Sequence, residues 1–233
     1  MIDLRSAALD ALAVLLPVEC AGCGADDRGL CVACRDALQP EVSSRLVGEN
    51  LRVWSGLEYD GVTRAVILAL KRDGRMDAAR ALAPALAAAV IAAVDGQAGV
   101  DAIQVVAVPG TRGAYRRRGF DPVRVLIARA GLGSRHVFAP ARTHEVQKLL
   151  TVDQRERNLR DAFRMRSAVA GHRILLIDDV VTSGATLREA ARVLREAGAD
   201  VVGAAVVAST PRRFAPVVEP VETRWSSLSR PGG

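Results

Sequence analysis

The stretch ILLIDDVVTSGAT, residues Ile174–Thr186, decides the fold class of this 233-residue chain. Four aliphatic residues predict a buried strand, and Asp178 and Asp179 follow directly at its expected end. A turn with hydroxyl groups and glycine comes next, and then a helical pattern begins. Ligands of open α/β sheets bind beyond the carboxyl ends of the strands, so the stretch predicts a binding site as well as a fold.

The turn after the acidic pair has the chemistry of a phosphate site. It offers backbone N–H groups, three hydroxyls and a helix amino terminus, a combination that binds phosphate well. The adjacent carboxylates can accept hydrogen bonds from vicinal hydroxyls, and a ribose 5-phosphate carries both groups. The sequence has no Walker A pattern. The candidate residues are Asp178, Asp179, Val181, Thr182, Ser183, Gly184, Ala185 and Thr186.

Strand and helix patterns alternate along the rest of the chain. Strand-like runs cover residues 51–59, 101–109, 172–179 and 199–209, with helical patterns between them. This alternation predicts an α/β fold with a doubly wound, mostly parallel sheet. We expect Pro84 to kink or split the Ala-rich helix 76–94, and the arginine-rich segment 110–120 to be a loop.

All four cysteines lie in one short segment, CAGCGADDRGLCVAC. Their spacing is Cys20-x2-Cys23-x7-Cys31-x2-Cys34, and two CxxC pairs can close a tetrahedral site for a structural Zn²⁺. Redox-active cysteines and an iron–sulfur site are the alternatives. Nothing near the four thiols offers an open ligand position, so we do not expect a catalytic metal here.

Charge is distributed unevenly along the chain, whose formal net charge is +6. Residues 111–166 contain fourteen Lys and Arg against five Asp and Glu. A GC-rich genome that favours Arg codons would explain this bias, and so would contact with phosphates. The most apolar run, Leu82–Val94, is too short to span a bilayer, and we expect a cytoplasmic protein with no membrane span.

The stretch Ile174–Thr186 closely resembles the phosphoribosyl-pyrophosphate (PRPP) signature of type I phosphoribosyltransferases. With the four-cysteine pattern ahead of it, the chain from about Leu9 to Ser209 resembles the ComF, or competence protein F, family. Three further segments carry this resemblance: Tyr59–Arg75, Val106–Pro122 and Arg142–Phe163.

The resemblance implies a type I phosphoribosyltransferase-like fold with a small N-terminal four-cysteine zinc-knuckle unit. We expect a helix and the zinc unit over residues 1–45 and the phosphoribosyltransferase-like domain over residues 46–210. The Pro-, Ser- and Arg-rich residues 211–233 show no periodicity and predict a disordered tail.

The resemblance also implies that the chain binds PRPP with Mg²⁺ and belongs to the glycosyltransferase class, with an undetermined acceptor. Asp178 and Asp179 would hold the ribose hydroxyls as the catalytic pair, and residues 181–186 the 5-phosphate. Residues 142–163 would form a mobile lid. The pyrophosphate loop would consist of Pro109, Gly110, Thr111 and Arg112.

Three positions depart from what such families usually carry. Thr182 stands where hypoxanthine-type enzymes have an acidic residue that acts on the purine, which argues against a 6-oxopurine acceptor. Asp121 stands where the ComF family usually has Asn, and Gly110 replaces a bulkier residue. These departures concern the substrate contacts more than the fold.

The resemblance implies a role in DNA uptake during natural competence. Candidate partners are PRPP or a related phosphoribosyl ligand, single-stranded DNA, and competence helicase or DNA-processing proteins. Two alternatives to an enzyme stay open: a non-catalytic PRPP- or nucleotide-binding adaptor, and a single-stranded DNA-binding protein. Few aromatic residues are available to stack on bases.

Overall fold

A five-stranded sheet forms the centre of the computed structural model, which describes residues 18–27, 29–99, 102–139 and 163–211. The strand order is β3-β4-β9-β8-β5. Strands β4, β9, β8 and β5 run parallel, and β3 pairs antiparallel with β4 at one edge. The predicted mostly parallel sheet is confirmed. Its strands are β3 (Ser43–Val47), β4 (Leu51–Glu58), β5 (Ile103–Ala107), β8 (Arg173–Val181) and β9 (Asp200–Ser209).

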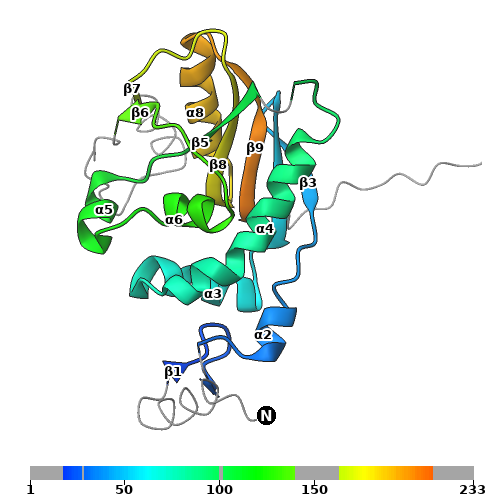
Figure 1. Ribbon diagram of the computed structural model, residues 1–233, viewed down its shortest axis with the longest axis vertical. Coiled ribbons are helices and arrows are strands. Elements are labelled where there is room, and N and C mark those ends of the chain that lie inside the picture. The colour runs from blue at the N-terminus through cyan, green and yellow to red at the C-terminus, as the bar shows by residue number, and fades with distance from the viewer. Residues whose placement is uncertain (1–17, 28, 100–101, 140–162, 212–233) are drawn as a thin grey trace, which may run out of the picture.

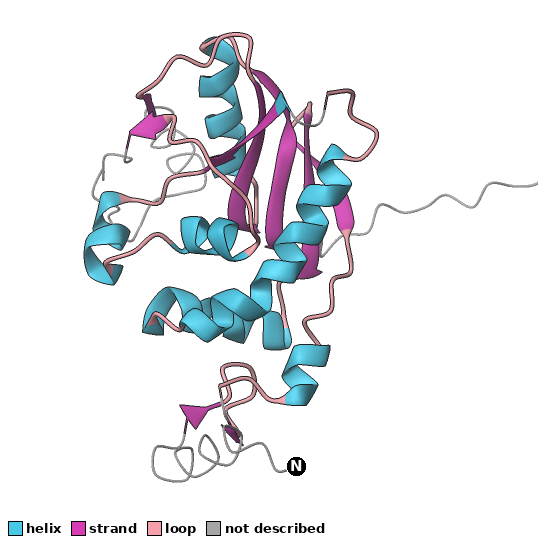
Figure 2. Ribbon diagram, viewed as in Figure 1, coloured by secondary structure: helices cyan, strands magenta, loops and turns pink. Residues whose placement is uncertain are grey.

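Helices cover both faces of this sheet (Figures 1 and 2). Helices α3 (Gly61–Asp73), α4 (Met76–Val94) and α6 (Pro122–Arg129) share one apolar core with Leu175 and Ile177 of β8. Helix α8 (Ala185–Glu196) shares the other core with Ile174 and Leu176. Successive side chains of a strand point to opposite faces, so the continuous apolar run of β8 serves two cores. The fold is therefore doubly wound, as predicted.

Helix α4 is continuous through Pro84, so the Ala-rich segment is not split. It packs tightly on β4: a Cβ added at Gly56 would lie 2.1 Å from the carbonyl oxygen of Ala85, and only glycine fits there. Within the part of the chain that the structure describes, α4 is the one helix long and apolar enough to cross a membrane. Half of its apolar window is buried in this core.

The arginine-rich segment that we expected to be a loop contains a helix, α5 (Arg112–Arg118). The Thr111 side chain caps its start by accepting a hydrogen bond from the backbone N–H of Ala114 at 3.2 Å. Gly119 ends it in the left-handed region, at φ 76°. These caps satisfy backbone groups at both ends of a segment that has no apolar periodicity, which explains why the pattern misled the prediction.

The cysteine segment packs against the helices at one end of the molecule (Figure 1). It contains β1 (Val18–Glu19), β2 (Asp26–Asp27) and α2 (Val32–Asp36), and Cys20, Leu30, Cys34 and Leu38 join the core of α3 and α4. Arg75 fastens this contact by donating hydrogen bonds to the carbonyl oxygens of Glu19 and Gly29, each at 2.7 Å.

The predicted domain limits stay predictions, and the limit between residues 45 and 46 falls within β3. A short hairpin of β6 (Phe138–Ala139) and β7 (Arg164–Met165) completes the described elements. The predicted N-terminal helix, the lid over residues 142–163 and the tail lie outside the described residues, except for Phe163 and Pro211.

Candidate functional site

The acidic pair lies in β8, near its carboxyl end. Asp178 is partly exposed and Asp179 is buried, and the backbone N–H of Asp179 donates to Oδ1 of Asp178 at 2.8 Å. Lys71 of α3 places its Nζ 2.8 Å from Oδ2 of Asp179. Strand β8 extends two residues beyond the pair, to Val181, so both carboxylates are held by paired backbone rather than by a loop.

The environment of the pair favours the protonated form of one carboxyl. Desolvation by the surrounding protein, and then the negative charge of Asp179, raise the pKa of Asp178 from 3.8 to about 8. Burial also raises the pKa of Asp121, and Asp121 and Asp179 lie close enough to repel each other. The three carboxyls and Lys71 form a site with excess negative charge, which suits ligand hydroxyl donors and a ligand that carries a cation.

The phosphate turn joins β8 to α8. Gly184 has φ 76° and precedes the first turn of α8, and its Cβ position would clash with Val47 at 2.1 Å. Thr182 and Ser183 are exposed, and the Ser183 hydroxyl accepts from the backbone N–H of Ala185 at 3.4 Å. The turn therefore has the left-handed backbone that needs glycine, followed by a helix amino terminus, as an anion site requires.

Arg45 supports this turn from the edge strand β3, and the sequence analysis missed it. Its guanidinium donates to the carbonyl oxygens of Val181 at 3.1 Å and Thr182 at 2.5 Å. It also donates to the carbonyl oxygen of Thr210 at 3.4 Å. Since all three acceptors are backbone atoms far away in the sequence, no motif points to Arg45.

The predicted pyrophosphate loop lies beside the acidic pair. It follows β5, whose Ala107 is the register partner of Ile177 in β8, and the backbone N–H of Val108 donates to the Ile177 carbonyl at 2.8 Å. Pro109, Gly110 and Thr111 therefore leave the sheet next to Asp178. Arg112 begins α5 directly after them. The structure thus brings the acidic pair and the predicted pyrophosphate loop together at the carboxyl ends of the neighbouring strands β8 and β5.

The four cysteine sulfurs lie within 4.8 Å of one another and can hold a metal ion such as zinc. The Sγ atoms of Cys23 and Cys31 are 3.8 Å apart, which is about the edge of a tetrahedron with Zn–S bonds of about 2.3 Å. Burial acts to raise the pKa of Cys20. Hydrogen bonds from backbone N–H groups, of which that of Cys31 has the largest effect, outweigh it and lower the pKa to about 6. Burial and the neighbouring thiols raise the pKa of Cys34. A thiolate-binding cation suits this cluster.

Gly22 leaves room for the buried thiol of this cluster. A Cβ at Gly22 would lie 2.6 Å from Sγ of Cys34, so the first CxxC pair can approach the second only with glycine there.

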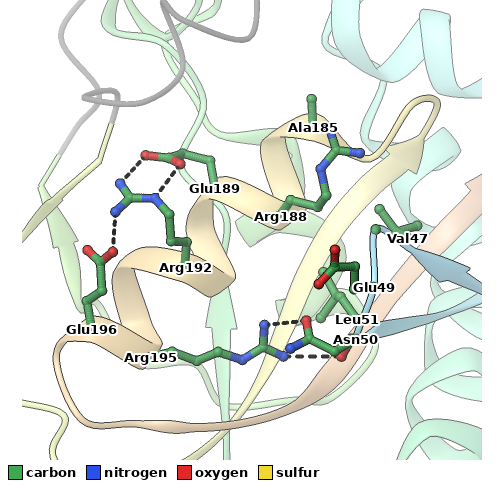
Figure 3. Close-up of a pocket in the computed structure, with 11 residues that line it drawn as sticks. Val47, Glu49, Asn50, Leu51, Ala185, Arg188, Glu189, Arg192, Arg195 and Glu196 are labelled. Atoms are coloured by element: carbon green, nitrogen blue, oxygen red, sulfur yellow. Dashed lines mark hydrogen bonds and ion pairs between the residues drawn. The ribbon is translucent and has the colours of Figure 1, made fainter.

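A different pocket, of about 560 Å³, lies between α8 and the β3–β4 hairpin (Figure 3). Its lining has three arginines and three glutamates. Arg192 reaches Glu189 at 2.6 Å and Glu196 at 2.5 Å, and Arg195 reaches Asn50 at 2.9 Å. Its charges are balanced and it lacks the acidic pair, and it borders the candidate site through Ala185 of the phosphate turn.

Comparisons with known proteins agree with this geometry. Residues 125–224 match the phosphoribosyl transferase domain, which includes β8, the turn, α8 and β9. The chain is 32% identical over 104 residues to the DNA utilization protein YhgH of Escherichia coli K12 and 34% identical to that of Salmonella typhi. Each match covers 42% of this chain and 46% of the relative, so the chain spans about half the length of these curated relatives.

A crystal structure of adenine phosphoribosyltransferase from Rhodothermus marinus is also similar, with a TM-score of 0.38 and 18% identity, over 77% of this chain and 88% of that one. The family match covers strands β8 and β9 and helix α8, which contain the acidic pair and follow the phosphate turn. Residues 125–224 of this chain are therefore similar to the phosphoribosyl transferase domain, and 104 of its residues are similar to the DNA utilization proteins.

Proposed function

We propose that this chain binds PRPP as its magnesium complex and transfers the phosphoribosyl group to an acceptor. One arrangement carries the proposal: the acidic pair directly precedes a phosphate turn, and the Pro109–Arg112 loop leaves the neighbouring strand beside it. Each feature alone is common in α/β proteins. Together they match the vicinal hydroxyls, 5-phosphate and pyrophosphate of one ligand.

The residues of the site have separate roles in this proposal. Asp178 and Asp179 accept hydrogen bonds from the two ribose hydroxyls, and the N–H groups of residues 181–186 hold the 5-phosphate. Lys71 fixes Asp179 through their 2.8 Å ion pair. The Mg²⁺ that arrives with PRPP neutralises oxygens of its pyrophosphate.

Transfer breaks the bond between ribose C1 and a pyrophosphate oxygen, and pyrophosphate leaves with the electron pair. The acceptor nucleophile forms the new bond at C1 and releases its proton to solvent. Charge develops on the leaving group and on the ribose, so the residues act mainly through electrostatics and positioning.

The cysteine cluster supports a structural zinc ion in the same chain. The four sulfurs supply all the ligands of a tetrahedral site, which excludes water from the metal. We propose a cytoplasmic location, since reducing conditions keep thiols available for zinc.

A role linked to DNA is also proposed, because the curated relatives are named DNA utilization proteins. Residues 111–166 carry fourteen basic against five acidic residues, which favours contact with nucleic acid phosphates. A single-stranded DNA-binding protein or a non-catalytic adaptor is therefore the second candidate. PRPP turnover in an acceptor screen separates enzyme from adaptor, and filter binding of single-stranded oligonucleotide at low salt tests the DNA function.

Calorimetric titration with PRPP and Mg²⁺ tests the main proposal, and the affinity should rise between pH 7 and pH 9. Asp178, with its pKa of about 8, loses its proton in this range, and an ionised acceptor binds hydroxyl donors more strongly. In Asp178→Asn the rise should flatten. If the titrations show no PRPP binding at any of these pH values, the proposal is refuted.

The same pKa shift has an opposite consequence for stability. The folded-state pKa of Asp178 is raised above 3.8, so its contribution to the free energy of unfolding is fully present below pH 3.8. That contribution is lost as the pH rises towards about 8. Ligand affinity and stability of the free protein should therefore change in opposite directions between about pH 7 and pH 8.

Arg45→Met should weaken PRPP binding about tenfold, because the carbonyl groups of the phosphate turn lose charge-assisted hydrogen bonds that set the turn's shape. Methionine keeps an apolar stem of similar length. Arg52→Met on β4 is the matched control, since Arg52 is exposed and its guanidinium donates to the Ser44 hydroxyl at 3.4 Å, away from the phosphate turn. Equal affinities of the two variants would show that Arg45 does not position the turn.

A further inference from the structure

A second hollow, the arginine cavity, opens beside the proposed pyrophosphate loop. Its volume is about 750 Å³, which is enough for one nucleotide. Its walls are formed by residues 109–111, by α5, by the start of α6 and by the segments around residues 136 and 166. The lining has one carboxylate, Asp121, and five arginines: Arg116, Arg118, Arg124, Arg135 and Arg166.

The arginines of this cavity have no acidic partners among the described residues. Arg135 donates to Oε1 of Gln104 at 2.7 Å and lies 3.0 Å from Nδ1 of His172. Arg124 lies 2.7 Å from Nδ1 of His136. None of the ion pairs within the described part of the chain involves any of the five. The pocket beside α8 differs, because glutamates there match the arginines in number.

His136 reports independently on this excess of positive charge. Desolvation lowers its pKa, and the charges of Arg124 and Arg166 lower it further, while Asp121 acts in the opposite direction. Two guanidinium groups therefore act on one imidazole at the cavity wall, and one carboxyl, that of Asp121, partly offsets their charge. Such a surface binds anions, since each bound negative charge reduces the repulsion among the guanidinium groups of the cavity.

The cavity also offers an aromatic surface. Tyr115 is 56% exposed although it is a large side chain, and it lies on α5 with Arg116 and Arg118. Phe120, just beyond α5, lines the same cavity. Aromatic rings beside guanidinium groups suit a nucleobase that is linked to a phosphate.

We propose that the arginine cavity binds a nucleoside phosphate as a second ligand, separate from the ribose 5-phosphate site. The ligand's phosphate contacts the arginines, and its base lies against Tyr115 and Phe120. The cavity borders residues 109–111, on the side where pyrophosphate would leave. An in-line acceptor attacks ribose C1 from the opposite side, so this nucleotide is not the acceptor of the proposed transfer. The nucleotide is either free or the end of a nucleic acid strand.

Adenosine 3′-monophosphate is the probe of choice, because it lacks the groups that the acidic pair and the phosphate turn would bind. It has no 5-phosphate for the turn after β8, and its 3′-ester removes the free vicinal hydroxyls that Asp178 and Asp179 would bind. Calorimetry should show binding of this probe, with adenosine binding at least about tenfold more weakly. A hexathymidylate with a 3′-phosphate distinguishes a strand end from a free nucleotide.

The variant Arg124→Gln/Arg166→Gln should weaken the probe about tenfold or more, while PRPP affinity stays within about twofold. Arg64→Gln/Arg129→Gln is the matched control, since both arginines are exposed, on α3 and α6, and neither lines the cavity. Equal weakening in both variants would reduce the effect to overall charge and overturn the proposal. Absence of binding by both phosphate probes overturns it as well.

Nuclear magnetic resonance supplies a readout on the unchanged protein. Saturation with adenosine 3′-monophosphate should raise the pKa of His136, because the phosphate offsets Arg124 and Arg166, and adenosine should leave it unchanged. A His136 pKa that does not move contradicts the assignment even if a variant fails to fold.

The outcomes also separate this inference from the proposed function. Binding of the 3′-phosphate probe without any PRPP binding leaves the cavity assigned and refutes the proposed function. PRPP binding without binding of either phosphate probe has the opposite meaning.

Discussion

Replacing both Asp178 and Asp179 with asparagine should lower the affinity for PRPP by about 100-fold or more. At pH 9, where Asp178 with its pKa of about 8 is ionised, each carboxylate would accept a charge-assisted hydrogen bond from a ribose hydroxyl, and such bonds contribute about 1.5–3 kcal/mol each. At about 1.4 kcal/mol per tenfold change, the loss of two exceeds two orders of magnitude. Calorimetry with PRPP and Mg²⁺ measures the change directly.

The fold should survive this double change. Asparagine keeps the shape of the side chains, and the raised pKa of Asp178 shows that its ionised form is unfavourable in the folded protein. Asp179→Asn does lose the ion pair with Lys71. Asp200→Asn is the control, since Asp200 begins β9, at the amino end of the parallel strands and away from the acidic pair. An unchanged PRPP affinity in the double variant would move the ligand site elsewhere.

Replacing Cys34 with serine should remove the metal and lower the melting temperature by about 10 °C. We expect about one zinc ion per chain in the unchanged protein, because four sulfurs at tetrahedral spacing complete one site. Serine is a poor zinc ligand, and the small cysteine segment depends on the metal for its shape. Metal analysis and thermal unfolding measure the two effects.

Ala33→Ser serves as the control for this variant. It adds a hydroxyl to the same helix α2 at an exposed neighbour of Cys34, without touching the sulfur cluster. Its metal content and melting temperature should equal those of the unchanged protein. Folded, reduced protein that contains no zinc would contradict the metal assignment.

The sequence predicted best those features whose signals are local. The apolar run of β8, its acidic pair and the following turn are contiguous, and alternating patterns along the chain were enough for the doubly wound sheet. The grouping of the four cysteines followed from their spacing. In each case, residues near one another in the sequence supply the physical cause.

The remaining features depend on distant contacts. Arg45 and Thr182 are 137 positions apart, and the acceptor is a carbonyl oxygen that every residue has. Arg75 likewise binds backbone carbonyls of the cysteine segment. Helix α5 was missed for a different reason: its caps, Thr111 and Gly119, are local, but they stabilise a segment without apolar periodicity. The arginine cavity appears only when segments around residues 116, 136 and 166 come together.

The way Arg75 fastens the cysteine segment bears on how this protein can evolve. Arg75 belongs to the turn between α3 and α4, yet its hydrogen bonds end on Glu19 and Gly29, and Cys20 and Cys34 belong to the same apolar core as those helices. A recombination event that carried the cysteine segment to an unrelated protein would leave part of its apolar surface uncovered. We therefore expect the segment to be inherited together with α3 and α4, and not to spread as a portable module.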